Sequence, residues 1–275
     1  VKITQGGLIQ KLIEMHPREV GDRKRNNTPA EEEIFDEHVS SRARSLDDKE
    51  RSLYLGLIMT LMYLARLSRP DILLPVTFLA SKTHVATEKD REHALRIVRY
   101  LENFKEEGMI LHCSDLKIEI HCDASHLVHK AAGKGHTGFY VTLGNSRSYV
   151  HGRSGKQKYV ATSSTEAEVI AALDAVKFAV WLRNLLVELQ ITPLAEMTLL
   201  QDNKSAMMLQ ENPSNKRTAH LTSKLRYVQE QIQLGKLRSE HVPTKELAAD
   251  LMTKPLQGSH YTEHSETILG SRWSK

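Results

Sequence analysis

The sequence predicts an α/β protein in which a mixed sheet is flanked by helices and preceded by a mostly helical region. Three observations predict this class. Up to about residue 106, apolar residues recur at helical spacing. After Gly108, short β-branched and aromatic runs are separated by turn-forming residues. Beyond residue 163, helical segments alternate with strand-like runs, as is typical of α/β layouts.

The first 106 residues are predicted to form helices joined by loops. The predicted helices cover residues 2–16, 53–67, 72–82 and 88–108. Residues 21–50 are charged and irregular, which indicates a loop or linker. The run 53–67 is the most apolar of the chain, but a membrane-spanning helix needs about 20 apolar residues. We therefore expect a buried core helix there.

The second half of the chain is predicted to contain the sheet. Strand-like runs cover 109–113, 117–123, 137–143, 146–152, 197–201 and 237–243, and the Gly-Asn pair at 144–145 indicates a tight turn. A long helix is expected from Ser163 or Ser164, either of which can cap its free amides, to about Gln190. Shorter helices are expected at 203–211, 220–234 and 245–253. These patterns place a helical region at 1–106, an α/β domain at 107–256 and a C-terminal tail at 257–275.

The composition is that of a globular protein. Of the 275 residues, 40% are hydrophobic and 26% are charged. The net charge of +4, with a pI of about 8.9, is compatible with a polyanionic partner but is shared by many proteins without one. The two cysteines, Cys113 and Cys122, make neither a disulfide framework nor a zinc site, so a reducing compartment is expected. P-loop and dinucleotide-binding glycine motifs do not occur, and no signal-peptide pattern is seen.

Two glutamates near the start of the long predicted helix point in different directions. On a helical wheel with 100° per residue, Glu168 heads an apolar stripe that includes Ala175 and Leu186. Glu166 falls about 160° away, on the side predicted to face solvent. A carboxylate at the head of a buried stripe is costly unless it is paired, which favours a functional role for Glu168. The alternative is an acid that favours the positive end of the helix dipole and reaches water.

Three aspartates lie where strands or a short helix could bring them towards Glu168. Asp123 and Asp202 each follow a predicted strand, and Asp250 lies in an apolar setting in the last short helix. Sites form at the carboxyl ends of parallel strands, although one such Asp alone is more often a turn or cap residue. Carboxylates that converge repel one another unless a cation is present, and oxygen ligands suit Mg²⁺ or Mn²⁺. The ordered set therefore predicts a divalent-metal site.

A series of sequence blocks runs in order through residues 120–256. The blocks read CDAS, TGFYVTLG, SGKQKYVATSSTEAE, WLRNLL, QDNKSA, RTAHL, HVP and LAADLMTKPL. Together they resemble the ribonuclease H domain of copia-type LTR retrotransposon Pol polyproteins. Upstream, KITQGGLIQKLIE, NNTP, YLARLSRPDI and VRYL resemble, more loosely, the thumb and connection that precede ribonuclease H. No Y-x-D-D polymerase motif occurs, so the chain resembles the C-terminal part of such a reverse transcriptase.

The resemblance implies an RNase H-like fold, with a mixed five-stranded sheet, and a reaction. By position in the motifs, Asp123, Glu168, Asp202 and Asp250 would bind two Mg²⁺ (or Mn²⁺) ions. The family's chemistry is hydrolysis of the RNA strand of an RNA–DNA hybrid, leaving 3′-hydroxyl and 5′-phosphate ends. His220 matches an accessory position, with a structural hydrogen bond as the alternative. The implied partners are the hybrid, the upstream palm and fingers and other Pol products, with no membrane.

Two features depart from the family pattern, and further residues are candidates for substrate binding. Val169 stands where the family often has Tyr, and the segment 127–136 is unusual for the loop after the first strand. A hybrid is recognised through its shape, phosphates and 2′-hydroxyls, which favours basic and polar side chains beside the acids. The candidates are Lys156, Lys158, Asn203, Lys204, Ser205 and Arg217. The alternative for each lysine is a solvated surface position.

Two other functions are compatible with the pattern. A catalytically silent or repurposed nucleic-acid-binding or assembly module would keep the fold, but the four acids are intact, which argues against decay. A transposase or integrase would share the fold but would have Glu as its last acid, where this chain has Asp250. Cleavage of a labelled hybrid separates the leading hypothesis from a module that only binds.

Overall fold

The computed structural model describes residues 1–20, 26–36, 42–112, 115–144, 148–191, 195–211 and 222–274. The described residues form two compact units. The first contains residues 1–110 together with 254–275, and the second contains 111–253. Residues 257–275, which the sequence suggested as a tail, include a helix that belongs to the first unit.

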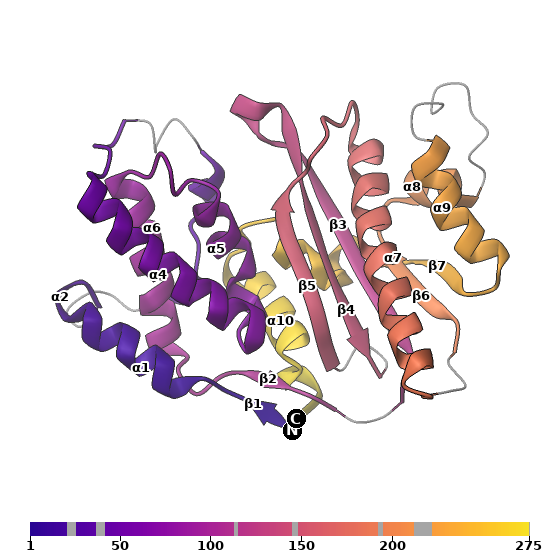
Figure 1. The fold of residues 1–275 in the computed structure, drawn as a ribbon, viewed down its shortest axis with the longest axis horizontal. Coiled ribbons are helices and arrows are strands. Elements are labelled where there is room, and N and C mark those ends of the chain that lie inside the picture. Colours follow the sequence, from indigo (N-terminus) through magenta and orange to yellow (C-terminus); the bar gives the residue numbers. More distant parts are fainter. Residues whose placement is uncertain are drawn as a thin grey trace. The chain divides into compact units, whose positions relative to one another are not determined.

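The first unit is mainly helical, in agreement with the apolar spacing of its sequence (Figure 1). Its helices are α1 (Gly6–Met15), α2 (Pro17–Val20), α4 (Asp48–Leu67), α5 (Leu73–Ala80), α6 (Glu88–Asn103) and α10 (Gly258–Leu269), with 3-10 turns η1 (Glu32–Phe35), η2 (Pro70–Ile72) and η7 (Ser271–Ser274). The expected strand at 109–113 is shorter, β2 (Met109–Ile110), and pairs with β1 (Lys2–Ile3) in a small antiparallel sheet. These two strands therefore lie outside the sheet of the second unit.

Helix α4 starts earlier than the apolar run suggested because its first turn is polar and capped. The side chain of Asp47 accepts a hydrogen bond from the backbone of Glu50, and the Glu50 side chain accepts one from the backbone of Asp47. This capping box satisfies amides that a helix end leaves free. Residues such as Ile58 and Leu61 are fully buried, as expected for a core helix. None of the helices in the described ranges is long and apolar enough to cross a membrane.

A buried ion pair ties α10 to the rest of the first unit. Arg69 and Asp71, both fully buried, form a two-pronged pair with N–O distances of 3.0 and 2.7 Å. The Tyr100 hydroxyl donates to the Asp71 carboxylate, and the Tyr261 hydroxyl of α10 donates to the Asp71 carbonyl. Buried charges need such partners, because an unpaired buried charge is strongly destabilising.

The second unit contains the mixed five-stranded sheet that the sequence predicted, in the order β5-β4-β3-β6-β7. The strands are β3 (Ile118–His129), β4 (Lys134–Leu143), β5 (Ser148–Lys156), β6 (Met197–Gln201) and β7 (Leu237–His241). The first three pair antiparallel, whereas β6 pairs parallel with both β3 and β7. The turn residue Asn145 lies outside the described residues, and Gly144 before it has a positive φ of 75°.

Helix α7 (Ser164–Glu188) packs against the sheet and supplies much of the core (Figure 1). Its alanine-rich stripe meets alternate residues of β3 and β4, including Ile120 and Val141. Small side chains let the helix backbone approach the sheet closely. Helices α8 (Lys204–Glu211) and α9 (Thr222–Gln233) pack beside α7, and 3-10 turns η5 (Thr244–Glu246) and η6 (Ala248–Met252) follow β7. The predicted helix at 245–253 is thus replaced by two tighter turns.

Strand β3 is longer than predicted. It continues past Asp123 to His129, with a register shift after Ser125, and is followed by a short turn η3 (Lys130–Ala132). Leu127 has a positive φ of 56° at this irregularity, which is uncommon for a residue with a side chain. Most of the unusual segment 127–136 is therefore the end of the β3–β4 hairpin.

Candidate active site

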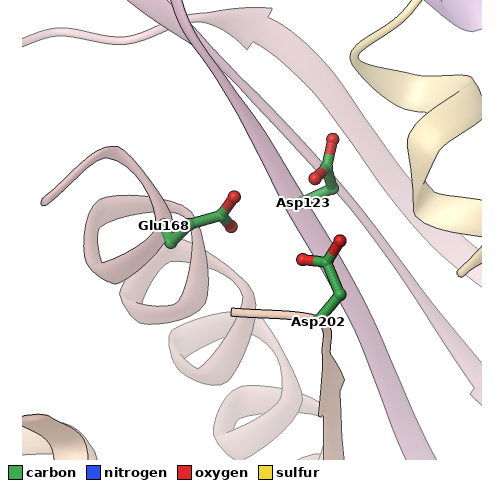
Figure 2. A group of neighbouring side chains, drawn as sticks. All are labelled: Asp123, Glu168 and Asp202. Atoms are coloured by element: carbon green, nitrogen blue, oxygen red, sulfur yellow. The ribbon is translucent and has the colours of Figure 1, made fainter. Parts of the chain in front are cut away.

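Three carboxylates from distant parts of the chain converge at one place in the second unit. Asp123 lies in β3, Glu168 in α7 and Asp202 directly after β6. One oxygen atom of each lies within 4.8 Å of the others. Figure 2 shows the three side chains pointing towards a shared space between the helix and the two strands. The expectation that Asp123 and Asp202 lie near Glu168 agrees with this geometry, but Asp123 lies within β3 and not at its end.

The sheet topology explains why the two aspartates meet. Strands β3 and β6 are parallel neighbours, and their last register pair is His121 with Leu200. Asp123 and Asp202 each lie two residues beyond this pair, on adjacent strands at the same edge. The chain then turns into α8, where the Asn203 side chain accepts a hydrogen bond of 3.0 Å from the Ala206 backbone amide. Asp202 is therefore held between a strand end and a capped helix start.

Glu168 is held in place by the start of α7. The helix begins after Ser163, whose hydroxyl accepts a hydrogen bond of 3.1 Å from the Glu166 amide. Glu168 lies in the second turn and is buried, with 5% of its surface exposed. The wheel argument, which placed this residue on the buried side of the helix, agrees with the structure.

The expectation that Glu166 faces solvent is wrong. Its side chain is 6% exposed and accepts hydrogen bonds from the Thr162 backbone amide (2.8 Å) and hydroxyl (2.7 Å). The wheel failed because the residues before the helix fold back over this side of the first turn, which a wheel does not represent. Ser163 satisfies a free amide of the helix start, and Glu166 holds Thr162, the residue before this cap, against the first turn.

The site concentrates negative charge, and its donors suit a divalent cation. Burial raises the pKa of the Cys122 thiol well above its usual range, and the charges of Glu168, Asp123 and Asp202 raise it further. The three acids offer only carboxylate oxygens as ligands, and Mg²⁺ and Mn²⁺ prefer these over nitrogen or sulfur. A cation would offset the mutual repulsion of the three charges. The residues present therefore fit such an ion.

One further predicted site residue, Asp250, is described by the structure but is not among the three. Asp250 is buried in η6, a turn that packs against β3 and β4, but it is not one of the carboxylates within 4.8 Å. His220 lies outside the described residues, as does Arg217. The structure thus brings together three of the five residues that the sequence suggested for catalysis.

Four of the candidate substrate-binding residues are exposed near the starts of α7 and α8. Lys156 and Lys158 are exposed in the segment that leads into α7, and Lys204 and Ser205 are exposed in the first turn of α8. The backbone carbonyl of Lys158 accepts a hydrogen bond of 2.9 Å from the Lys134 side chain. This bond connects the hairpin end to the segment before α7.

The sequence reasoning missed several residues that support the acids. The Thr253 hydroxyl donates to the carboxylate of Asp123, and the Thr244 hydroxyl donates to Asp202 at 2.7 Å. At the hairpin end, the rings of His129 and His136 are buried and hydrogen-bonded at 2.9 Å. These contacts join residues far apart in sequence. The only available signal was that polar side chains occur within otherwise apolar segments.

Comparison with known proteins identifies homologues of the chain. No protein-family model matches the sequence. The chain is 32% identical over 217 residues to the retrovirus-related Pol polyprotein from transposon RE1 of Arabidopsis thaliana, a match over 78% of this chain and 15% of that protein. It is 29% identical over 202 residues to the corresponding polyprotein from transposon TNT 1-94 of Nicotiana tabacum, over 73% of this chain and 15% of that protein. The chain thus spans about a seventh of the length of these relatives.

Solved structures of ribonucleases H show weaker similarity. LC11-RNase H1, isolated from compost by a metagenomic approach, is 18% identical with a TM-score of 0.38, covering 50% of this chain and 92% of that one. An N-terminal RNase H domain from Mycobacterium tuberculosis is 13% identical with a TM-score of 0.40, covering 58% of this chain and 99% of that one. On the evidence of its sequence relatives, the chain belongs with the Pol polyproteins of copia-like retrotransposons and corresponds to a limited part of them.

Proposed function

We propose that this chain is a metal-dependent endonuclease that hydrolyses the RNA strand of RNA–DNA hybrids. The observation that carries the proposal is the convergence of Asp123, Glu168 and Asp202 within 4.8 Å at one edge of the sheet. The ordered sequence blocks and the homology to Pol polyproteins of transposons support it. Hydrolysis would serve reverse transcription, in which the RNA template must be removed after it has been copied.

The carboxylates would hold divalent ions against the substrate. Two such ions, when bound, would supply an activated water and stabilise the leaving oxygen in phosphodiester hydrolysis. Asp123 and Glu168, both buried, would provide fixed ligands, whereas Asp202 is partly exposed and lies nearer to solvent. Asp250, on the turn that packs beside β3, is the proposed fourth acid. His220 keeps its proposed accessory role.

The exposed basic and polar residues around the acids would bind the duplex. Lys156 and Lys158 precede α7, which carries Glu168, and Lys204 and Ser205 begin α8, which follows Asp202, and their exposure supports this role. Asn203 can donate to phosphate or sugar through its amide nitrogen, because its oxygen caps α8. Arg217 keeps its proposed substrate-binding role. Contacts of this kind predict binding that weakens steeply as the salt concentration rises.

Incubation with a labelled RNA–DNA hybrid tests the proposal. The wild-type protein should cut the RNA strand in Mg²⁺, leave 3′-hydroxyl and 5′-phosphate ends, and lose the activity in EDTA. Asp202→Asn should reduce the rate at least a hundredfold, since it removes a charged ligand and is tolerated at a partly exposed position. Asp115→Asn is the matched control, because Asp115 is exposed and lies outside the acidic cluster.

Each alternative function gives a different result. Retention of the hybrid without cleavage in Mg²⁺ or Mn²⁺ would favour a nucleic-acid-binding module. Equal cleavage by wild type and Asp202→Asn would show that the nuclease activity comes from a contaminant or from another site. Duplex DNA and duplex RNA of the same sequence should remain intact under the conditions that cut the hybrid.

A further inference from the structure

The segment that follows β7 supplies hydroxyl groups to two of the three carboxylates. Thr253 donates to Asp123, from which it is separated by 130 residues, and Thr244 donates to Asp202 across 42 residues. Thr253 is buried, with 1% of its surface exposed, whereas Thr244 is exposed. We propose that Thr253 is a positioning residue that orients Asp123 for divalent-metal binding. This inference rests on the proposed metal-dependent function.

The strand beside Asp123 has a glycine that makes room for Thr253. Gly138 on β4 is the register partner of Asp123 on β3. A Cβ atom at Gly138 would lie 2.4 Å from the Thr253 methyl carbon and 2.7 Å from the Cβ of Met252. Both distances are shorter than non-bonded carbon atoms allow. Only glycine therefore permits the 252–253 backbone to lie against the strand opposite Asp123.

Two serines hold the same piece of backbone through its carbonyl groups. The Ser125 hydroxyl, on β3, donates to the Thr253 carbonyl at 3.1 Å. The Ser154 hydroxyl, on β5, donates to the Met252 carbonyl at 2.7 Å. Hydrogen bonds from two strands, with β4 between them, fix the backbone that carries the Thr253 side chain. The position of the hydroxyl relative to Asp123 is therefore determined by the sheet.

A buried histidine pair sets the direction of the Ser154 hydrogen bond. Ser154 has a single hydroxyl proton, which goes to the Met252 carbonyl, so its oxygen must accept from His136 Nε2 at 2.7 Å. His136 Nδ1 then accepts from His129 Nε2 at 2.9 Å. We assign both tautomers from this network. The unusual hairpin end thus supports the turn that carries Thr253, which gives the 127–136 segment a structural role beside the site.

Orientation of a ligand matters because metal ions select geometry. A carboxylate has two oxygens, so the bond from Thr253 to one leaves the other for an ion. Residues that hydrogen-bond a ligand in this way commonly affect metal affinity or activity by about 10- to 100-fold when they are replaced. The same reasoning gives Thr244 a weaker effect on Asp202, since Thr244 is exposed and can be replaced by water.

The test compares Thr253→Val with Thr253→Ser. Valine keeps the shape and removes the hydroxyl, whereas serine keeps the hydroxyl. Calorimetry with Mn²⁺, in the absence of nucleic acid, should show affinity about tenfold or more weaker for Thr253→Val and close to wild type for Thr253→Ser. Thr142→Val is the matched control, because Thr142 is equally buried on β4 and donates instead to the Glu119 carbonyl. At limiting Mn²⁺, Thr253→Val should cut the hybrid with a lower kcat than wild type and with little change in the KM for the hybrid.

The outcomes separate this inference from the proposed function. Wild-type Mn²⁺ affinity in Thr253→Val, or equal weakening in Thr253→Val and Thr253→Ser, would overturn the positioning role even if the protein cuts hybrids. If the wild type binds Mn²⁺ but cuts no hybrid, the nuclease proposal fails while the Mn²⁺ comparison still decides the role of Thr253. Should Thr253→Val not fold, Ser154→Ala replaces it; several-fold weaker Mn²⁺ binding is expected, and wild-type affinity would contradict the inference.

Discussion

At the scale of single residues, Glu166 and Glu168 are both buried in the first turns of α7, for different reasons. Glu168 contributes to the acidic cluster, and Glu166 accepts two hydrogen bonds from Thr162. The charge of Glu166 is also favoured by the positive end of the helix dipole. One acid therefore serves the site and the other stabilises the helix that carries it.

Replacing Glu166 should destabilise the second unit without removing the site. Glu166→Ala deletes the acceptor of two hydrogen bonds from Thr162, and hydrogen bonds to charged groups contribute about 1.5–3 kcal/mol. Urea denaturation should show a lower midpoint with an unchanged slope. Ser164→Ala, at an exposed position of the same turn, is the control and should change the midpoint little. A midpoint equal to wild type in Glu166→Ala would contradict a stabilising role for these bonds to Thr162.

Residue patterns predicted part of the acidic site but missed the residues that hydrogen-bond to its carboxylates. Asp202 could be found because the end of its strand is visible in the sequence, and Glu168 because helical spacing is regular. Asp123 was found although the predicted strand end is wrong, since β3 continues to His129. Thr253 could not be found, because its bond to Asp123 spans 130 residues and depends on the space left by Gly138. Such contacts follow from the packed fold and have no local periodicity.

At the scale of elements, the end of the β3–β4 hairpin contains a buried titratable side chain, His136. Burial, together with the charges of His129 and Arg153, lowers the pKa of His136 to about 3. In the unfolded chain this histidine has a pKa of about 6.5. Between these two values the unfolded state binds a proton that the folded state does not. The contribution of neutral His136 to the free energy of unfolding is therefore complete above about pH 6.5 and decreases as the pH falls towards 3.

The pH dependence of unfolding tests the neutral state of His136. As the pH is lowered below 6.5, one such histidine decreases the free energy of unfolding by up to about 1.4 kcal/mol per pH unit. His136→Asn should be less stable than wild type at pH 7 but should lose less stability between pH 7 and pH 5. His241→Asn, at an exposed position on β7, is the control. An identical pH slope in wild type and His136→Asn would contradict this interpretation.

Most elements could be predicted, and the exceptions have physical reasons. Periodicity located α4, α6 and α7 and the strands of the sheet, because these elements bury a regular face. The segment 245–253 forms 3-10 turns instead of a helix, and its backbone is instead held by side chains of β3 and β5. The pairing of β1 with β2 joins segments over 100 residues apart, and short strands of this kind have no pattern of their own.

At the scale of the whole molecule, the sequence indicated two parts, and the structure assigns both ends of the chain to the first unit. The change of pattern near residue 106 lies close to residue 110, where the first unit gives way to the second. Residues 254–275 return to the first unit through α10, whose Tyr261 bonds to Asp71. This return could not be predicted, because α10 has a weak apolar pattern and its partner lies about 190 residues earlier.

The stability of the second unit should depend on divalent metal if the three carboxylates form the site. In metal-free buffer Asp123, Glu168 and Asp202 repel one another, so Glu168→Gln should raise the melting temperature by a few degrees or leave it unchanged. A bound ion stabilises the folded state by about 2.7 kcal/mol when its concentration is a hundred times the Kd. Glu188→Gln, at the exposed end of α7, provides the matched control.

Thermal unfolding with increasing Mn²⁺ therefore decides whether these acids form a metal centre. We predict that Mn²⁺ raises the melting temperature of the wild type and of Glu188→Gln but has little effect on Glu168→Gln. No shift in the wild type, or the same shift in Glu168→Gln, would contradict a metal site formed by these three side chains.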